Sequence, residues 1–258
     1  MKFFSIITIC FNNLEELKNT HKSILEQDYS GFEWIVVDGN SQDGIKEWLE
    51  QINPTKWISE KDKGIYDAMN KGINMATGDY LIFMNSGDGF ASASALTKTK
   101  EKIINAKLPV FAYGDSMDIS ESGEKFLRKA KKINKLWLGM TTQHQAMFFN
   151  REKLNGLKYS LDYPLSADYA FISKVVKSNK PSEMLYLGIP VCNFEMGGAN
   201  EQYRFKAMKE DFRIRRDILK LNTITCLGLY ALHYIHTKIK RMNPSVRFIR
   251  HQSVTKQK

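Results

Sequence analysis

Short apolar runs alternate with amphipathic segments through the first third of the chain. Residues 3–11 and 33–38 are apolar runs that end in polar residues, a pattern typical of strands buried on both faces of a parallel sheet. Between the two runs, side chains recur at helical spacing, namely Leu14, Leu17, His21, Ile24 and Leu25. The three segments together predict a βαβ unit.

The alternation continues to residue 84. The predicted elements, in order, are a turn over 38–44, a helix at about 43–51, a strand at 57–59, a helix over 65–75 and a strong strand at 80–84. Gly78 precedes the last strand, and glycine is suited to ending a helix. This order predicts a doubly wound α/β sheet, in which ligands bind at the carboxyl ends of the strands.

From about residue 106 the pattern becomes less regular. It predicts strands at 110–113, 146–149 and 185–194, a basic loop at 125–135, helices at 167–178 and 201–221, and a 13-residue, mostly apolar stretch from Thr223 to Ile235. We interpret residues 1–200 as one domain with two halves, 1–105 and 106–200. Residues 201–258 form a basic, amphipathic helical region.

Composition bounds the class of protein. With 43% hydrophobic and 26% charged residues, the 258-residue chain is typical of a globular protein with a sizeable core. It has no uninterrupted apolar run of about 18 residues, so we expect no membrane span. Residues 3–10 lack a cleavage site and indicate a strand rather than a signal peptide. The cysteines, Cys10, Cys192 and Cys226, are too far apart for a zinc site and odd in number, which favours a reducing cytosol.

The formal net charge of +10 is concentrated at one end. Residues 201–258 carry 14 Lys and Arg against 4 Asp and Glu, whereas residues 1–200 carry 24 of each. A basic amphipathic helix followed by an apolar stretch too short to span indicates docking on an anionic membrane surface. A C-terminal helix that packs on the catalytic body, with a solvated basic end, explains the pattern equally well. A nucleic-acid-binding protein would also explain the basic tail but not the neutral body.

Three aspartates occupy positions where such a sheet holds a ligand. Asp38 closes the second strand and can accept hydrogen bonds from a base or ribose, or cap the next helix. Asp88 follows the strongest strand and can coordinate Mg²⁺ or Mn²⁺ together with phosphate oxygens, or form an Asx turn. Asp168 lies in the first turn of a helix, where a cap is more common than a catalytic base. From the residues alone, the chain is an enzyme that binds a nucleotide ligand.

Eight segments carry a family resemblance. They are Ser5-Ile6-Ile7-Thr8, Trp34-Ile35-Val36-Val37-Asp38-Gly39, Ser41-Gln42-Asp43-Gly44, residues 60–72 from Glu60 to Gly72, Asn85-Ser86-Gly87-Asp88, His144-Gln145-Ala146, Ser166-Ala167-Asp168-Tyr169 and Met196-Gly197-Gly198. Through these segments, over roughly residues 3–200, the chain resembles the family 2 glycosyltransferases. In order and spacing it is especially similar to the enzymes that build colanic acid and O-antigen repeat units. The resemblance implies the GT-A fold, a Rossmann-like α/β fold with a mostly parallel sheet. It also implies that residues 1–200 form the catalytic domain, with a nucleotide-sugar-binding half (1–105) and an acceptor half (106–200).

The resemblance also assigns roles. It implies that Asp38 contacts the nucleotide, that Thr8 lines the base pocket, and that Asp62, Lys63 and Asn70 lie beside the donor, although solvation of a helix surface explains Asn70 as well. Asp88 matches the metal-binding acid of the family's Asp-x-Asp motif, Asp168 matches the catalytic base, and His144 and Gln145 are candidates for binding acceptor or diphosphate; a structural role for His144 is as plausible. Asn85 and Gly87 stand where many members have aspartates, so a Mn²⁺ or Mg²⁺ site here has fewer charges.

The implied reaction is an inverting transfer. A sugar, from UDP-hexose or a similar donor, passes to a sugar on undecaprenyl diphosphate at the inner face of the bacterial cytoplasmic membrane, giving a β-linkage in O-antigen, capsule or colanic-acid-like polysaccharide. Two alternatives stay open: a noncatalytic sugar-nucleotide-binding protein, and a glycosyltransferase that acts on a soluble or protein acceptor. A nucleotidyltransferase is disfavoured, because its Gly-rich phosphate loop is replaced by Cys10-Phe11-Asn12-Asn13.

Overall fold

A computed structural model describes residues 2–120, 123–195, 203–242 and 252–253. The helices are α1 (Leu14–Leu25), α2 (Ile45–Ile52), α3 (Ile65–Met75), α4 (Ala95–Asn105), α5 (Ala167–Ser178), α7 (Arg204–Asp217) and α8 (Thr223–Met242), with 3₁₀ turns η1 (Ile133–Leu138), η2 (His144–Ala146) and η3 (Pro181–Glu183). The strands are β1 (Phe4–Cys10), β2 (Phe32–Asp38), β3 (Lys56–Ser59), β4 (Tyr80–Phe83), β5 (Gly89–Phe90), β6 (Phe111–Ile119), β7 (Lys125–Arg128), β8 (Met147–Asn150), β9 (Met184–Glu195) and β10 (Gln252–Ser253).

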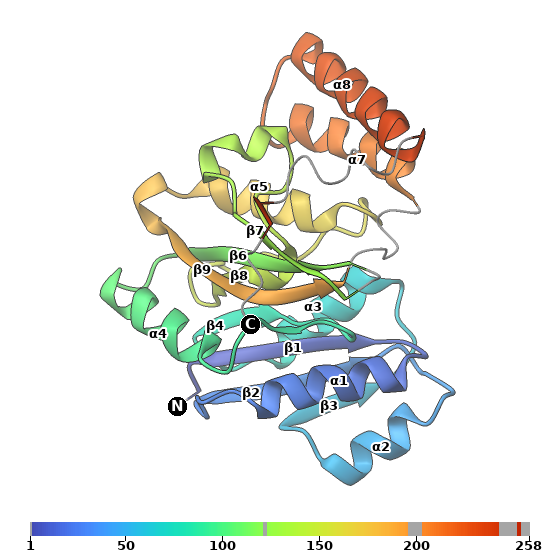
Figure 1. Ribbon diagram of the computed structural model, residues 1–258, viewed down its shortest axis with the longest axis vertical. Helices are drawn as coiled ribbons and strands as arrows, with labels where there is room; N and C mark the ends of the chain where they lie inside the picture. The colour runs from blue at the N-terminus through green and yellow to red at the C-terminus, as the bar shows by residue number, and fades with distance from the viewer. Residues whose placement is uncertain (1, 121–122, 196–202, 243–251, 254–258) are drawn as a thin grey trace.

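One mixed sheet runs through the molecule (Figure 1), in the order β10-β7-β6-β8-β4-β1-β2-β3, with β9 beside β6 and β5 beside β9. The first half is parallel, because β1 pairs with β2 and β4, and β2 pairs with β3, all in the same direction. From β8 onwards the pairs β4–β8, β6–β8 and β6–β7 are antiparallel, while β6–β9 is parallel. The α/β class is therefore confirmed, and the doubly wound parallel pattern holds for residues 4–83.

Each face of the sheet is covered by its own helices. Along β1, Ile7 and Ile9 join the core beneath α3 and α5, whereas Phe4 and Ile6 join the core beneath α1, α2 and α4. This division follows from the alternation of side chains along a strand. Because both faces are buried, β1 is apolar at five of its seven positions, which is the pattern that predicted it.

The C-terminal helices form a hairpin on one end of the molecule (Figure 1), with α7 against α5 and α8 outside α7. The ring centroids of Phe205 and Tyr234 lie 5.1 Å apart, and Cys226 and Leu229 on α8 are buried. Packing on the catalytic body, one of the two interpretations of this region, is therefore present for α7, which contacts α5, while the inner face of α8 packs on α7. The segment Met196-Gly197-Gly198 and most of residues 243–258 lie outside the described residues.

Candidate active site

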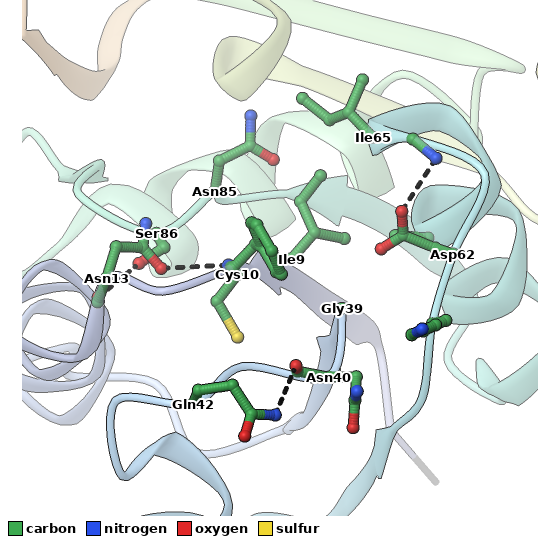
Figure 2. A pocket seen from close by; sticks show the side chains of 14 residues that line it. Ile9, Cys10, Asn13, Gly39, Asn40, Gln42, Asp62, Ile65, Asn85 and Ser86 are labelled. Atoms are coloured by element: carbon green, nitrogen blue, oxygen red, sulfur yellow. Dashed lines mark hydrogen bonds between the residues drawn. The ribbon is translucent and has the colours of Figure 1, made fainter.

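A cleft of about 940 Å³ opens at the carboxyl ends of β1 and β2, where the sheet topology places ligands. Its lining, shown in Figure 2, consists of Ile9, Cys10, Phe11, Asn13, Gly39, Asn40, Gln42, Lys61, Asp62, Gly64, Ile65, Ala68, Asn85 and Ser86. These residues come from the ends of β1 and β2, the start of α3 and the turn after β4. The cleft thus gathers four of the eight segments that carry the family resemblance.

Asp38 lies beneath this cleft rather than in its wall. Its carboxylate is fully buried and accepts hydrogen bonds from the backbone N–H and hydroxyl of Ser41 and, at 2.6 Å, from the hydroxyl of Ser59. These bonds fix the loop after β2, whose Gly39, Asn40 and Gln42 do line the cleft. A direct contact between Asp38 and the nucleotide stays a prediction.

Thr8 is buried behind the cleft as well. Its hydroxyl oxygen accepts a hydrogen bond from the indole N–H of Trp34 at 3.0 Å. Asn70 is held by the backbone of Tyr159: its amide donates to the Tyr159 carbonyl at 2.9 Å and accepts from the Tyr159 N–H at 2.8 Å. The structure thus gives Thr8 and Asn70 partners within the protein, and their donor-binding roles stay predictions.

Asp62 lies in the wall of the cleft, where its carboxylate accepts the N–H of Gly64 at 2.8 Å. It also approaches Gly39 so closely that a Cβ at position 39 would lie 2.8 Å from the carboxylate oxygen, so the close packing of the two loops favours glycine there. Lys63, next to Asp62, is exposed, and its backbone N–H donates a hydrogen bond to the Asp67 carboxylate at 3.0 Å. In this structure the lysine in the lining is Lys61.

Asp88 closes a tight turn after β4. The Asp88 N–H donates to the Asn85 carbonyl at 3.0 Å, and the Thr20 hydroxyl on α1 donates to the Asp88 carbonyl at 2.7 Å. Gly87 has φ +95°, a conformation that glycine tolerates best, which gives a physical reason for the missing aspartate at this position. Gln145 brings a second predicted residue to the turn, because its amide donates to the Asp88 carboxylate at 2.5 Å.

The turn offers two oxygen donors that a hard cation accepts, but they line different hollows: Asn85 lines the cleft, whereas Asp88 lines a smaller one beside α1. Asp88 offers a carboxylate, and the amide oxygen of Asn85 is buried, with no hydrogen-bond partner among the described residues. Mg²⁺ and Mn²⁺ accept such sites when substrate phosphates supply further oxygens. No cluster of three or more His, Cys, Asp or Glu side chains capable of holding a metal exists in the described part of the chain.

Asp168 lies at the start of α5, half-buried, with one carboxylate oxygen between two donors. The Tyr169 N–H donates to it at 2.8 Å and the Tyr66 hydroxyl at 3.2 Å. Burial raises the pKa of Asp168 to about 6, against the lowering effect of these two hydrogen bonds, and the nearby Asp211 adds to the rise. A carboxylate with such a pKa can accept a proton near neutral pH better than an ordinary aspartate can.

His144 is buried in an aromatic cluster rather than open to a ligand. Its Nε2 lies 2.7 Å from the Tyr159 hydroxyl, and its ring centroid lies 5.0 Å from that of Phe83. Burial lowers the pKa of His144 to about 4, so the imidazole is neutral at physiological pH. This environment supports the structural alternative for His144.

Several residues of the site have no signal in the sequence. The apolar ring of Phe11 would ordinarily be buried, but it is 60% exposed in the cleft wall. Glu210 on α7 accepts the N–H groups of Leu165 and Ser166 at 3.0 and 2.9 Å, and so anchors the loop that leads to Asp168. In the sequence, Glu210 looks like a solvated glutamate on a helix surface, because its partners lie 44 and 45 residues away.

The fold is shared with solved glycosyltransferases. TarS of S. aureus, solved in complex with UDP, superposes with a TM-score of 0.65 at 16% identity, covering 90% of this chain and 70% of TarS. The mannosyltransferase PcManGT of Pyrobaculum calidifontis, solved with GDP-Man and Mn²⁺, has a TM-score of 0.60 at 15% identity, covering 95% and 78% of the respective chains. These likenesses establish a nucleotide-sugar transferase fold of the GT-A type.

The family follows from sequence. Residues 5–158 match the family model described as Glycosyl transferase family 2. A relative named as an uncharacterized glycosyltransferase of Mycobacterium tuberculosis is 33% identical over 232 residues, which cover 83% of each chain. The protein belongs to the family 2 glycosyltransferases and is an enzyme of the transferase class.

Proposed function

We propose that this glycosyltransferase moves a hexose from a UDP-sugar to a sugar on undecaprenyl diphosphate, with inversion, during synthesis of a bacterial surface polysaccharide such as O-antigen. The observation that carries this proposal is the placement of Asp168. Its carboxylate is shielded enough to have a raised pKa and is joined through Tyr66 to α3, whose first turn lines the donor cleft. Asp168 does not line the cleft itself, and we assign it to the acceptor side, from which the acceptor hydroxyl approaches the donor.

In this mechanism the acceptor hydroxyl attacks the anomeric carbon as Asp168 takes its proton. The new C–O bond forms on the face opposite the diphosphate, whose bond to carbon breaks with the electron pair, so an α-linked donor gives a β-linked product. General-base assistance of this kind contributes about 10²- to 10⁴-fold. The cleft holds the nucleotide through the polar groups of Asn13, Asn40 and Gln42, with Phe11 as an apolar wall.

We include a divalent cation, Mn²⁺ or Mg²⁺, in the proposal. Asp88 and Asn85 would hold it, with Gln145 orienting the Asp88 carboxylate. When bound, the cation stabilises negative charge on the leaving diphosphate. The presence of Mn²⁺ in the PcManGT complex, which has the same fold, supports this part of the proposal.

The outer face of α8 supports a membrane-bound acceptor. Large apolar side chains are exposed along it, namely Ile224, Leu227, Leu232, Ile235, Ile239 and Met242. The exposed basic residues Lys238 and Arg241 lie on the same helix, at its edge next to α7, where they stack on the rings of Tyr234 and Phe205. An apolar face accompanied by basic side chains suits an anionic lipid surface. No helix in the described part of the chain has the length and apolarity needed to cross a membrane.

The Asp168→Asn variant tests the proposed base. The amide cannot accept the proton, so we expect transfer to fall by about 10²-fold or more while UDP affinity stays within about twofold. Released UDP and UDP binding by calorimetry are the two measurements, made after a screen of UDP-sugars against synthetic lipid-diphosphate acceptors with and without Mn²⁺. Transfer by Asp168→Asn at the wild-type rate would remove Asp168 from this role, and turnover only with soluble acceptors would favour that alternative.

A further inference from the structure

Tyr66 and Asp168 lie 102 positions apart in the sequence and meet across the two halves of the domain. The Tyr66 hydroxyl donates a hydrogen bond to Oδ1 of Asp168 at 3.2 Å. Tyr66 is only 7% exposed, so the bond is shielded from water. Of the residues that the structure describes, Tyr66 is the side chain that links the donor half to this carboxylate.

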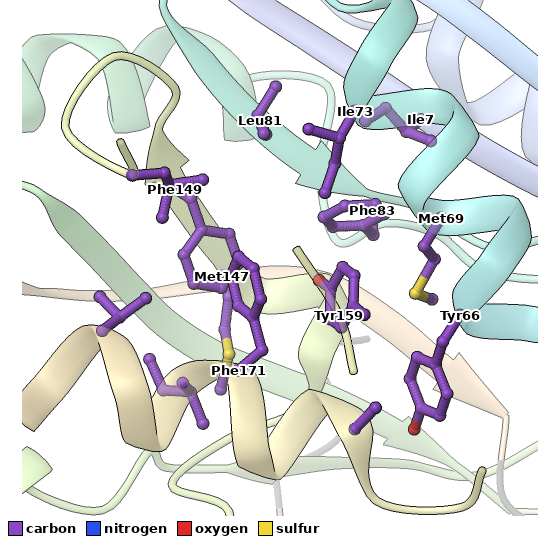
Figure 3. Packing of buried hydrophobic residues seen from close by; sticks show 14 of the residues in the cluster. Ile7, Tyr66, Met69, Ile73, Leu81, Phe83, Met147, Phe149, Tyr159 and Phe171 are labelled. Atoms are coloured by element: carbon purple, nitrogen blue, oxygen red, sulfur yellow. The ribbon is translucent and has the colours of Figure 1, made fainter. Parts of the chain in front are cut away.

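The position of Tyr66 is fixed by its neighbours. Its ring stacks on that of Tyr159, with centroids 5.6 Å apart, and Figure 3 shows the two rings side by side at the end of the buried cluster. Tyr159 is itself stacked on Phe171 at 4.4 Å and held through its backbone by Asn70. A phenol packed in this way keeps its hydroxyl at one place and one angle.

The same turn of α3 serves the donor cleft. Gly64, Ile65 and Ala68 line the cleft, and Tyr66 lies among them in the sequence but faces the opposite way, into the core. The first turn of α3 therefore lines the cleft on one side and reaches Asp168 through the Tyr66 hydroxyl on the other.

We propose that Tyr66 is a positioning residue for the general base, holding Oδ1 of Asp168 so that Oδ2 faces the acceptor hydroxyl. This inference rests on the proposed function, in which Asp168 takes the acceptor proton. A hydrogen bond to one carboxylate oxygen fixes the rotation of the group, and orientation of a base within hydrogen-bond reach is the first requirement for proton transfer.

The effect of the Tyr66 hydroxyl on the pKa of Asp168 can be separated from the effects of the other groups that face this carboxylate. From α5 comes the Tyr169 N–H, and from the preceding loop the Tyr159 ring. From α7 comes Asp211, whose charge opposes ionisation of Asp168 but is itself paired with Arg204 at 3.4 Å. Against this constant background, the Tyr66 hydroxyl favours the ionised carboxylate, so its removal is expected to raise the pKa of Asp168.

The experiment uses Tyr66→Phe in the full chain. Loss of the hydrogen bond should move the acid limb of the kcat/KM profile upward by about one pH unit, which lowers activity about fivefold at pH 6. Loss of the fixed orientation should add a smaller decrease in kcat/KM that persists above about pH 8. The same shift is expected in a ¹³C NMR titration of labelled aspartate carboxyls in the presence of UDP, with Asp168→Asn identifying the resonance. Replacement of Tyr66 by fluorotyrosine, a stronger donor of nearly the same shape, should move both in the opposite direction.

Tyr80→Phe is the matched control. It removes a buried hydroxyl that donates to the Pro109 carbonyl at 2.6 Å, at the amino end of β4, and should leave the pH profile unchanged. An unchanged titration in both Tyr66 variants, or a rate loss equal at every pH, would overturn the positioning role. Failure of the proposed function is distinct, because it shows as full transfer by Asp168→Asn, whereas the NMR titration reports the Tyr66 bond whether or not transfer occurs.

Discussion

The buried carboxylate of Glu33 links three other segments of the chain at one edge of the parallel strands. It is 1% exposed at the amino end of β2, where it accepts hydrogen bonds from the hydroxyls of Ser5 (2.7 Å) and Thr77 (2.9 Å) and pairs with Lys56 at 3.2 Å. Burial alone would raise the pKa of Glu33, but the hydrogen bonds from Thr77 and Ser5 and the partner Lys56 outweigh it and lower the pKa to about 2. The ionised group therefore stabilises the fold.

The sign of the pH dependence follows from that shift. Since the folded pKa lies below the unfolded value, the stabilisation is present above about pH 4.5 and is lost as the pH falls towards 2. We expect Glu33→Gln to lower the free energy of unfolding by roughly 3 kcal/mol at pH 7 and to remove most of this acid dependence. Urea unfolding across pH 2–7 checks it, with the exposed Glu101→Gln as control. Equal acid dependence in the wild type and Glu33→Gln would contradict the prediction.

Single residues of the site were predictable only as far as their neighbours in sequence define them. Asp38, Asp88 and Asp168 stand at a strand end, in a post-strand turn and in a first helical turn, positions that the apolar pattern locates directly. Their partners were not predictable, because Ser59, Gln145 and Tyr66 approach from distant segments. The sequence therefore indicated where the aspartates lie, but not that Asp38 is enclosed by hydroxyls and Asp168 by a phenol.

At the scale of elements, helix α7 helps to position Asp168. Glu210 accepts the N–H groups of Leu165 and Ser166, and Asp211 accepts the Ser166 hydroxyl at 3.0 Å, which fixes the first turn of α5. The side chain of Arg215, almost fully buried, extends the attachment by donating to the Trp137 carbonyl at 3.0 Å. The proposed boundary at residue 200 thus separates segments that are extensively hydrogen-bonded to each other.

Glu210→Ala should show this dependence. Two N–H groups would lose their acceptor, at a cost of about 1–3 kcal/mol each where water does not replace it, and Asp168, the proposed base, would lose its fixed position. We expect a lower Tm and at least a tenfold lower kcat with unchanged UDP affinity, whereas Glu210→Gln, which keeps an acceptor oxygen, should recover most of the loss. Lys209→Ala, on the exposed face of α7, is the control. A normal kcat for Glu210→Ala would exclude α7 from positioning Asp168.

The pattern missed α4 and cut β6 short, and in both elements polar residues stand where a core side chain was expected. The basic loop predicted at 125–135 begins instead with strand β7. Helix α4 buries Leu96, Thr99 and Ile103, and the threonine in the middle interrupts its apolar stripe. Strand β6 continues past the predicted residues 110–113 through Asp115 and Asp118, which in the fold are bonded by Tyr186 at 2.8 Å and paired with Arg128 at 2.8 Å. In contrast, the predicted helix over 65–75 has the same bounds as α3, because its apolar face is complete.

At the scale of the whole molecule, α8 places an apolar surface at the end farthest from α1 and α2 (Figure 1). The inner side of α8 packs on α7, so the exposed apolar side chains, which we call the α8 stripe, are not needed to hold the two helices together. Ile224 is 83% exposed, and Leu232 and Ile235 are more than half exposed. Such a stripe is a site for lipid or protein rather than for water.

Vesicle binding tests whether the exposed apolar stripe of α8 contacts a membrane or another protein. Because Ile224, Leu232 and Ile235 would each insert into the interface, replacing all three with serine should weaken binding to phosphatidylglycerol–phosphatidylethanolamine vesicles by about a hundredfold, on the order of 1 kcal/mol each. Folding should be unaffected, since these side chains contribute little to the core. Serine at Ile104 and Leu161, exposed apolar positions outside α8, is the control and should bind as the wild type does.

Salt and oligomeric state complete the test. Binding through Lys238 and Arg241 should weaken as salt rises from about 0.05 to 0.5 M, because the Debye length shortens, while the apolar contribution persists. Sedimentation velocity without vesicles reports the competing possibility that two copies pair through α8. A monomer that loses vesicle binding only in the α8 triple variant supports a membrane acceptor. Unchanged vesicle binding by that variant, or a dimer that it dissociates, would assign the stripe to a protein interface and favour a soluble acceptor.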